Sequence, residues 1–105
     1  MNIRQGDLLF VPVEEIPEHR TKQDDPVLRH GESTGHSHKL AVAEDAELFV
    51  GWRGGWNLYV KVGPNGVSVV HEEHHVVQLP ANQTFKVHVA REYDYLAGLT
   101  RQVRD

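Results

Sequence analysis

The sequence NLYVKVGPNGVSVV, residues 57–70, predicts two β-strands and the turn between them. In residues 57–62 apolar and polar side chains alternate, which is typical of a strand with one buried face. Residues 63–66 follow, and their Asn-Gly pair is the strongest short-range signal for a β-hairpin. Because residues 67–71 return with valines, which favour strands, we expect the two strands to pair with each other.

Short apolar segments separated by turn residues continue on both sides of this predicted hairpin. We expect strands in residues 7–13, 27–30, 36–43, 46–50, 76–79 and 84–89. Pro12 has no N–H to donate, so it should lie at a sheet edge or at a strand end. Residues 14–26 are polar and contain two prolines, which indicates a surface loop. So many short strands predict one all-β domain over residues 1–105, a small antiparallel barrel or a sandwich.

Length, charge and composition limit the classes of function. The chain has 105 residues, 39% hydrophobic and 25% charged, enough for one globular core. A net charge of −4 disfavours binding to long DNA or RNA, though not to a small anionic ligand. The absence of cysteine and of any long apolar run predicts a cytoplasmic protein with no membrane partner. Exposed strand edges in so small a chain predict a homodimer.

Eight histidines are the unusual feature of the composition, and six of them lie between residues 36 and 88. His36 and His38 follow a loop with two glycines, and on a strand they project to the same side, about 7 Å apart. The second group is His71-Glu72-Glu73-His74-His75. We expect the three histidines outside these groups, His19, His30 and His88, to be exposed without a role in the site.

The second histidine group has two structural interpretations. Its letters satisfy the H-E-x-x-H motif of helical zinc proteases. The valines around it and Pro80 after it favour strands instead, so we disfavour the helix. A tight corner at residues 72–73 would bring His71 and His74 together. The two histidine groups would then meet, with a carboxylate from Glu73 or Glu32.

Two kinds of chemistry suit such a cluster. In one, His36, His38, His71 and His74 bind a divalent transition metal, which favours imidazole and carboxylate ligands. In the other, no cofactor is needed, and His36, His38, His71, Glu73 and His74 act by general acid–base catalysis near neutral pH. Lys39 and Arg91 would neutralise charge on a phosphate, and Tyr93 would donate a hydrogen bond to the substrate.

Two resemblances carry further expectations. The run formed by Gly31, His36, His38, Glu44 and Gly51 is similar to the first cupin motif, although two spacings differ by one. Where the second cupin motif has a histidine, this chain has Phe85 after Pro80. The resemblance covers only the first half and implies a cupin-like sandwich with a metal.

The pattern GE-x-TGH-x-H, HEEH and REYD, over residues 31–94, resembles small proteins of phage and prokaryotic defence loci. Among these it looks like compact ring nucleases, which degrade cyclic oligoadenylate messengers. This resemblance implies an enzyme that cleaves a phosphodiester in a small, cyclic nucleotide. The alternatives are a cupin-like metal-binding protein or metalloenzyme that uses the same histidines, and a non-catalytic module that binds an anionic ligand.

Overall fold

The computed structural model describes residues 1–30, 36–51 and 57–89, and almost all of its regular structure is β-strand. Its strands are β1 (Ile3–Gln5), β2 (Leu8–Val13), β3 (Arg20–Gln23), β4 (Val27–His30), β5 (Ser37–Leu40), β6 (Ala46–Gly51), β7 (Asn57–Val62), β8 (Val67–Val70), β9 (Val77–Leu79) and β10 (Thr84–Val89). One 3-10 turn, η1 (Ala43–Asp45), precedes β6. The predicted strands are confirmed within about three residues at their ends, apart from the region of residues 14–26.

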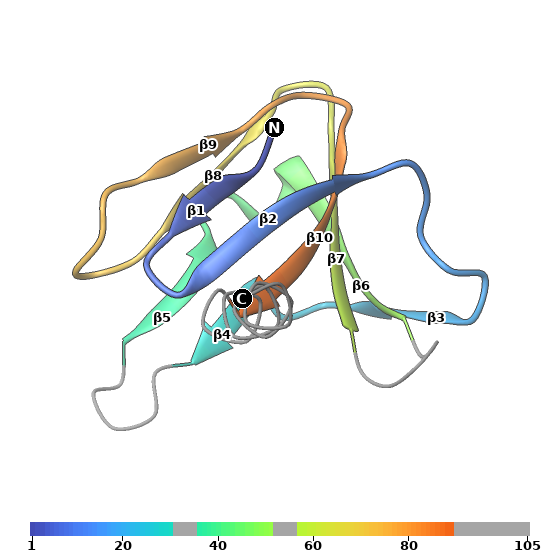
Figure 1. The fold of residues 1–105 in the computed structure, drawn as a ribbon, viewed down its shortest axis with the longest axis horizontal. Helices are drawn as coiled ribbons and strands as arrows, with labels where there is room; N and C mark the ends of the chain where they lie inside the picture. Colours follow the sequence, from blue (N-terminus) through green and yellow to red (C-terminus); the bar gives the residue numbers. More distant parts are fainter. Residues whose placement is uncertain (31–35, 52–56, 90–105) are drawn as a thin grey trace, which may run out of the picture.

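The strands form two antiparallel sheets (Figure 1). The six-stranded sheet has the order β1-β2-β10-β7-β6-β3, and the four-stranded sheet has the order β4-β5-β8-β9. The prediction of an all-β domain is confirmed. The barrel prediction is wrong, because neither sheet closes on itself: each ends in two edge strands without a shared ladder.

The predicted hairpin between residues 57–62 and 67–71 is also wrong. β7 pairs with β6 and β10, whereas β8 pairs with β5 and β9 in the other sheet. The Gly66 N–H donates to the Gly63 carbonyl at 3.3 Å, so Pro64 and Asn65 are the central turn residues. Proline at the second position of the turn and glycine at the fourth are typical of a type I turn. The backbone twist of a type I turn does not match that of a two-stranded hairpin. The segment therefore passes from one sheet to the other.

A two-residue hairpin does occur, at the N-terminus between β1 and β2. Gly6 has φ of +57°, and as the first of the two loop residues it occupies the position that type II′ turns reserve for glycine. The β1 ladder covers only Leu8 to Phe10 of β2. Pro12 therefore pairs on one side only, with Phe85, and the expectation of an edge-like position for it is confirmed.

Strand β3 lies inside the region predicted as loop, so that prediction is wrong for residues 20–23. Among the described residues β3 pairs only with β6, so it forms an edge of the sheet. Arg20, Thr21 and Lys22 are all exposed, so the strand has no apolar alternation for sequence reasoning to detect. Charged side chains of this kind are typical of strands that protect an open sheet edge.

One hydrophobic core lies between the two sheets. Phe10, Val60 and Phe85 enter it from the six-stranded sheet, and Val69 and Leu79 enter it from the four-stranded sheet. All five side chains are fully buried, at 0% exposure. Within the described ranges, no helix is long and apolar enough to cross a membrane.

Candidate functional site

The pairing of β5 with β8 brings the two histidine groups together. Lys39 lies opposite Val70, and Leu40 lies opposite Val69. Continuing this antiparallel register by one residue places His38 opposite His71. His36 precedes β5, and His74 follows β8 in a segment of bends rather than a helix, which argues against the zinc-protease interpretation.

The four imidazoles form a compact group, which we call the histidine cluster (His36, His38, His71 and His74). The centroid of the His71 ring lies 4.3 Å from that of His38, 4.6 Å from that of His74 and 5.9 Å from that of His36. The rings of His38 and His74 are almost parallel, at 8° and 5.9 Å. His71 is therefore the central ring, with an edge toward His36.

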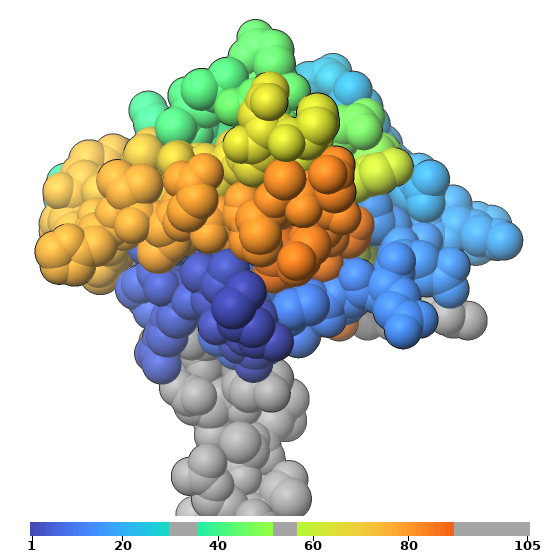
Figure 2. Space-filling view, turned by 90° about the horizontal axis from the view of Figure 1, so that it is seen from above, coloured from blue at the N-terminus to red at the C-terminus, as the bar shows by residue number. Residues whose placement is uncertain are grey.

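His38 is buried, at 3% exposure, and both of its ring nitrogens have partners. Nδ1 lies 2.8 Å from Gln5 Oε1, and Nε2 lies 2.9 Å from Asp7 Oδ1. Gln5 closes β1, and Asp7 follows in the turn after it. Figure 2 shows the N-terminal strands in blue directly against the segment around residues 70–80 in orange. The N-terminal hairpin thus forms one wall of the histidine cluster.

Burial lowers the pKa of His38, and the neighbouring His71 and His74 add to that effect. The hydrogen bond to Asp7 acts in the opposite direction without reversing it. Burial also acts to raise the pKa of Asp7, but the hydrogen bond and charge of His38 and the charge of Arg29 lower it overall. Arg29 Nε donates to Asp7 Oδ2 at 3.2 Å, so the carboxylate is held between β4 and His38.

Glu73 binds two imidazoles with different atoms. Its side-chain Oε1 lies 2.6 Å from His36 Nδ1, and its backbone N–H donates to His71 Nδ1 at 3.0 Å. The neighbouring Glu72 Oε2 accepts a hydrogen bond from the Ser37 N–H at 3.1 Å. Hydrogen bonds from its own backbone N–H and from Ser37 lower the pKa of Glu72. These contacts tie the segment after β8 to the start of β5.

The residues predicted to bind substrate have different positions. Lys39 is exposed and, by strand alternation, lies on the face of β5 opposite to that of His38. With Ser37, Val70, His71 and Glu72 it lines a shallow depression of about 250 Å³. Arg91 and Tyr93, like Gly31 and Glu32, fall outside the described residues. His71 is the residue that belongs both to the histidine cluster and to this depression.

The arrangement of the ring nitrogens bears on the predicted metal site. Among the residues that the structure describes, no group of three or more histidine, aspartate and glutamate side chains is placed to hold one. Both ring nitrogens of His38 are engaged, with Gln5 and Asp7. A ligand role for His38 would require breaking a buried hydrogen bond, which costs about 1–3 kcal/mol.

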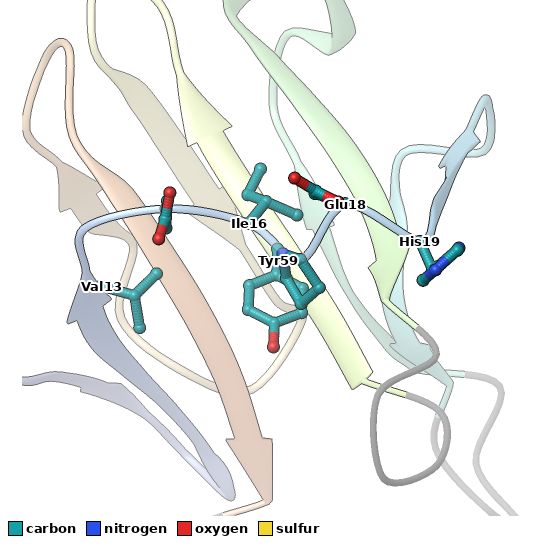
Figure 3. Close-up of a pocket in the computed structure, with 7 residues that line it drawn as sticks. Val13, Ile16, Glu18, His19 and Tyr59 are labelled. Carbon is teal, nitrogen blue, oxygen red and sulfur yellow. The ribbon is translucent and has the colours of Figure 1, made fainter.

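A larger depression lies elsewhere, between β7 and the chain after β2 (Figure 3). It measures about 1070 Å³, and its lining includes Val13, Ile16, Glu18, His19 and Tyr59. None of the residues predicted as a site borders it. This depression and the candidate catalytic residues therefore lie in different places. We place the site at the histidine cluster, because among the described residues only there do several hydrogen-bonded imidazoles converge.

Sequence reasoning missed three residues of the site: Gln5, Asp7 and Arg29. The composition of Gly6-Asp7 is typical of a turn, which indicates a hairpin but does not indicate that the hairpin contacts His38. The contact between Asp7 and His38 joins residues 31 positions apart, one in the turn between two strands of the six-stranded sheet and the other on a strand of the four-stranded sheet. No pattern within the sequence could have found it.

Replacing Gly6 with alanine should weaken the fold and displace His74. A Cβ atom at residue 6 would clash with the His74 ring at Nε2, and φ of +57° is unfavourable for alanine by about 1–2 kcal/mol. Chemical denaturation measures the stability, and histidine NMR signals report the displacement. Gly66→Ala is the matched control, because Gly66 has φ of +71° and its nearest neighbour is Leu79 O. Unchanged His74 signals in Gly6→Ala would contradict the contact.

Acidification should destabilise the protein below about pH 6.5. Since the folded pKa of His38 is lowered from its ordinary 6.5, the unfolded chain binds more protons in this range, and stability rises with pH. The loss therefore begins as the pH falls through 6.5. Asp7, whose pKa is lowered from 3.8, adds a second loss in stronger acid. The melting temperature of His38→Gln should depend less on pH between 7.5 and 5 than that of His19→Gln. Equal pH dependence of the two variants would contradict this assignment.

Comparison with known proteins identifies a family. Residues 4–88 match the model of a family described as a domain of unknown function, DUF8820. That range contains every described residue of the histidine cluster and its partners Gln5, Asp7 and Glu73. No curated protein and no solved structure matches the chain significantly. With most of its length covered by one family model, the chain belongs to the DUF8820 family.

Proposed function

We propose that the histidine cluster is a catalytic site that cleaves a phosphodiester in a small anionic nucleotide by general acid–base catalysis, without a cofactor. One observation carries the proposal: Glu73 contacts Nδ1 of both His36 and His71, as an acceptor from the first and a donor to the second, and we assign the two rings different tautomers on that basis. Its carboxylate accepts from His36 Nδ1, and its backbone N–H donates to His71 Nδ1. Contacts that served only to hold the fold together would not need to give the Nδ1 atoms of two imidazoles opposite hydrogen-bonding roles.

The tautomers assign different roles to the two rings. With its proton on Nδ1 and bonded to Glu73, His36 has its lone pair on Nε2, as a general base requires. With Nδ1 accepting a backbone N–H, neutral His71 has its proton on Nε2 and acts as a hydrogen-bond donor to a phosphoryl oxygen. His74 is exposed to solvent, and we assign it the role of protonating the leaving oxygen.

The reaction that fits this set uses the substrate's own 2′-hydroxyl. His36 Nε2 removes the proton from the hydroxyl, and the oxygen attacks the neighbouring phosphorus. The bond from phosphorus to the 5′-oxygen breaks, and protonated His74 gives its proton to that oxygen. The products are a 2′,3′-cyclic phosphate and a 5′-hydroxyl, and the two histidines exchange protons with water to return to their starting states.

His38 has a supporting role in this scheme. Both of its ring nitrogens are engaged, so it has no site for a proton from the substrate without losing Gln5 or Asp7. Its ring lies 4.3 Å from His71 and supports the central ring from the buried side. The sequence-based prediction of a direct catalytic or ligand role for His38 stays untested.

The substrate class is supported by charge and by motif resemblance. Lys39 beside His71 offers a cation to a phosphate at the depression that they share. The likeness of the motifs to ring nucleases favours a cyclic oligonucleotide with 2′-hydroxyls. Arg91 and Tyr93 remain proposed substrate-binding residues, and the cupin-like form of the sandwich, the homodimer and a cytoplasmic location remain proposals as well.

Turnover of a matched substrate panel tests the proposal. The protein is purified without a histidine tag and incubated with cyclic oligoadenylates, linear oligoadenylates and their 2′-deoxy analogues, with and without a chelator. We expect a 2′,3′-cyclic phosphate from the 2′-hydroxyl substrates, none from the deoxy analogues, and no effect of the chelator. Activity that depends on a stoichiometric bound metal would support the metalloenzyme instead. Tight binding without turnover would support a binding module.

A further inference from the structure

Gln5 is the most deeply buried polar residue next to the histidine cluster, at 2% exposure. Its Nε2 donates to the carbonyl of Val69 and to the carbonyl of His75, each at 2.8 Å. Its Oε1 lies 2.8 Å from His38 Nδ1. One side chain from β1 thus bonds to β5, to β8 and to the segment that follows β8.

These contacts leave the Gln5 amide only one orientation. Backbone carbonyls accept hydrogen bonds and cannot donate, so the atom that faces both Val69 and His75 must be the NH₂ group. The atom that faces His38 is then the carbonyl oxygen, which also only accepts. His38 must therefore carry a proton on Nδ1.

We propose that Gln5 is a positioning residue that keeps a proton on Nδ1 of His38, while Nε2 of the same ring faces Asp7, and that holds the two histidine segments in register. His38 hydrogen-bonds to Gln5, and its ring centroid lies 4.3 Å from that of His71, while the His75 carbonyl is held by the same amide. Because Gln5 holds both the His38 ring and the His75 backbone, it also fixes where the rings of His71 and His74 lie. The effect on turnover rests on the proposed function, whereas the tautomer and the tether do not.

The geometry of β1 explains why a buried glutamine is tolerated here. Gln5 is the last residue of β1, just before the Gly6 turn, so its side chain points inward beside the end of the strand. In the part of the chain that the structure describes, no buried side-chain nitrogen or oxygen lacks a partner. Since all its donors and acceptors are matched, the amide adds order without the cost of an unpaired polar group.

Two variants separate the two contributions of Gln5. Gln5→Met has a similar length but removes every hydrogen bond. Gln5→Glu keeps an oxygen that accepts from His38 Nδ1–H and loses the donated bonds to Val69 and His75. Gln23→Met is the matched control, because Gln23 Nε2 also donates to two backbone carbonyls, those of Asp25 and Val27, in a segment that carries no histidine of the cluster.

Histidine ¹⁵N NMR of the full chain reports the tautomers directly. In the unaltered protein we expect a protonated Nδ1 on His38. Gln5→Met should lose this signature and lower turnover by about 10²-fold, a typical effect of misplaced catalytic groups. Gln5→Glu should retain the signature while His71 and His74 signals shift, and Gln23→Met should change neither.

An unprotonated Nδ1 on His38 in the unaltered protein would overturn the proposal. So would a Gln5→Met spectrum in which His38, His71 and His74 match those of Gln23→Met. If instead the tautomer is as expected but no substrate in the panel is cleaved, the proposed function fails and the positioning role of Gln5 stands.

Discussion

His36→Ala is expected to lower turnover of a 2′-hydroxyl phosphodiester by about 10²–10⁴-fold, the usual contribution of a positioned general base. His36 is bound to Glu73 and partly exposed, with 32% of its side chain accessible, so its removal should leave the core intact. Glu73→Gln should have a smaller effect, because the amide keeps a hydrogen-bond acceptor but loses the charge that strengthens the base. Initial rates under substrate saturation measure both losses.

The control for this variant is His19→Ala, which removes an exposed imidazole at the separate depression beside Tyr59. Its rate and melting temperature should equal those of the unaltered protein. The assignment of His36 fails if His36→Ala retains more than about a tenth of the rate while its substrate affinity is unchanged. A pH–rate profile adds a second check, because loss of an imidazole base should remove the rise in rate on the acid side.

Phe85→Ala is expected to cost about 3–5 kcal/mol of the free energy of unfolding. Phe85 is fully buried on β10, the strand that pairs with both β2 and β7, and it belongs to the core between the sheets. The substitution leaves a cavity that the two paired neighbours cannot fill. Because domains of this size have only about 5–15 kcal/mol of stability, the loss should be visible as a large fall in the denaturant midpoint.

Phe49→Ala provides the comparison for this core prediction. Phe49 lies on β6, is only partly buried, and contacts the Arg20 guanidinium at 5.3 Å from its ring centroid. Its replacement should cost clearly less than that of Phe85. Equal costs for the two phenylalanines would show that the core is not centred between the sheets as described.

Much of the secondary structure could be predicted from the sequence, because alternating apolar residues are a local signal. The alternation in residues 57–62 and 84–89 marks strands that bury one face, and both are present. Strand β3 could not be predicted, since an edge strand with exposed Arg20, Thr21 and Lys22 buries too little to leave a pattern. Turn composition was less informative than it appeared: Gly63-Pro64-Asn65-Gly66 predicts a turn, but its hydrogen bond decides which kind.

The candidate site could be predicted only in part. His36, His38, His71 and His74 attract attention by their number and spacing, and strand parity indicates that His36 and His38 share a side. Their meeting with the second group depends on the pairing of β5 with β8, which is a contact between residues about 30 positions apart. Arg91 and Tyr93 lie outside the described residues, so their part in the site stays a prediction.

By itself, the sequence determined an all-β chain, a cluster-forming set of histidines and the turns between strands, because these depend on side-chain type and on neighbours along the chain. Only the tertiary structure decided that residues 57–62 and 67–70 belong to different sheets, and that Gln5 and Asp7 complete the surroundings of His38. The physical reason is the same for both. Strand pairing and buried hydrogen bonds are selected by the packing of the whole core, and no short segment contains that information.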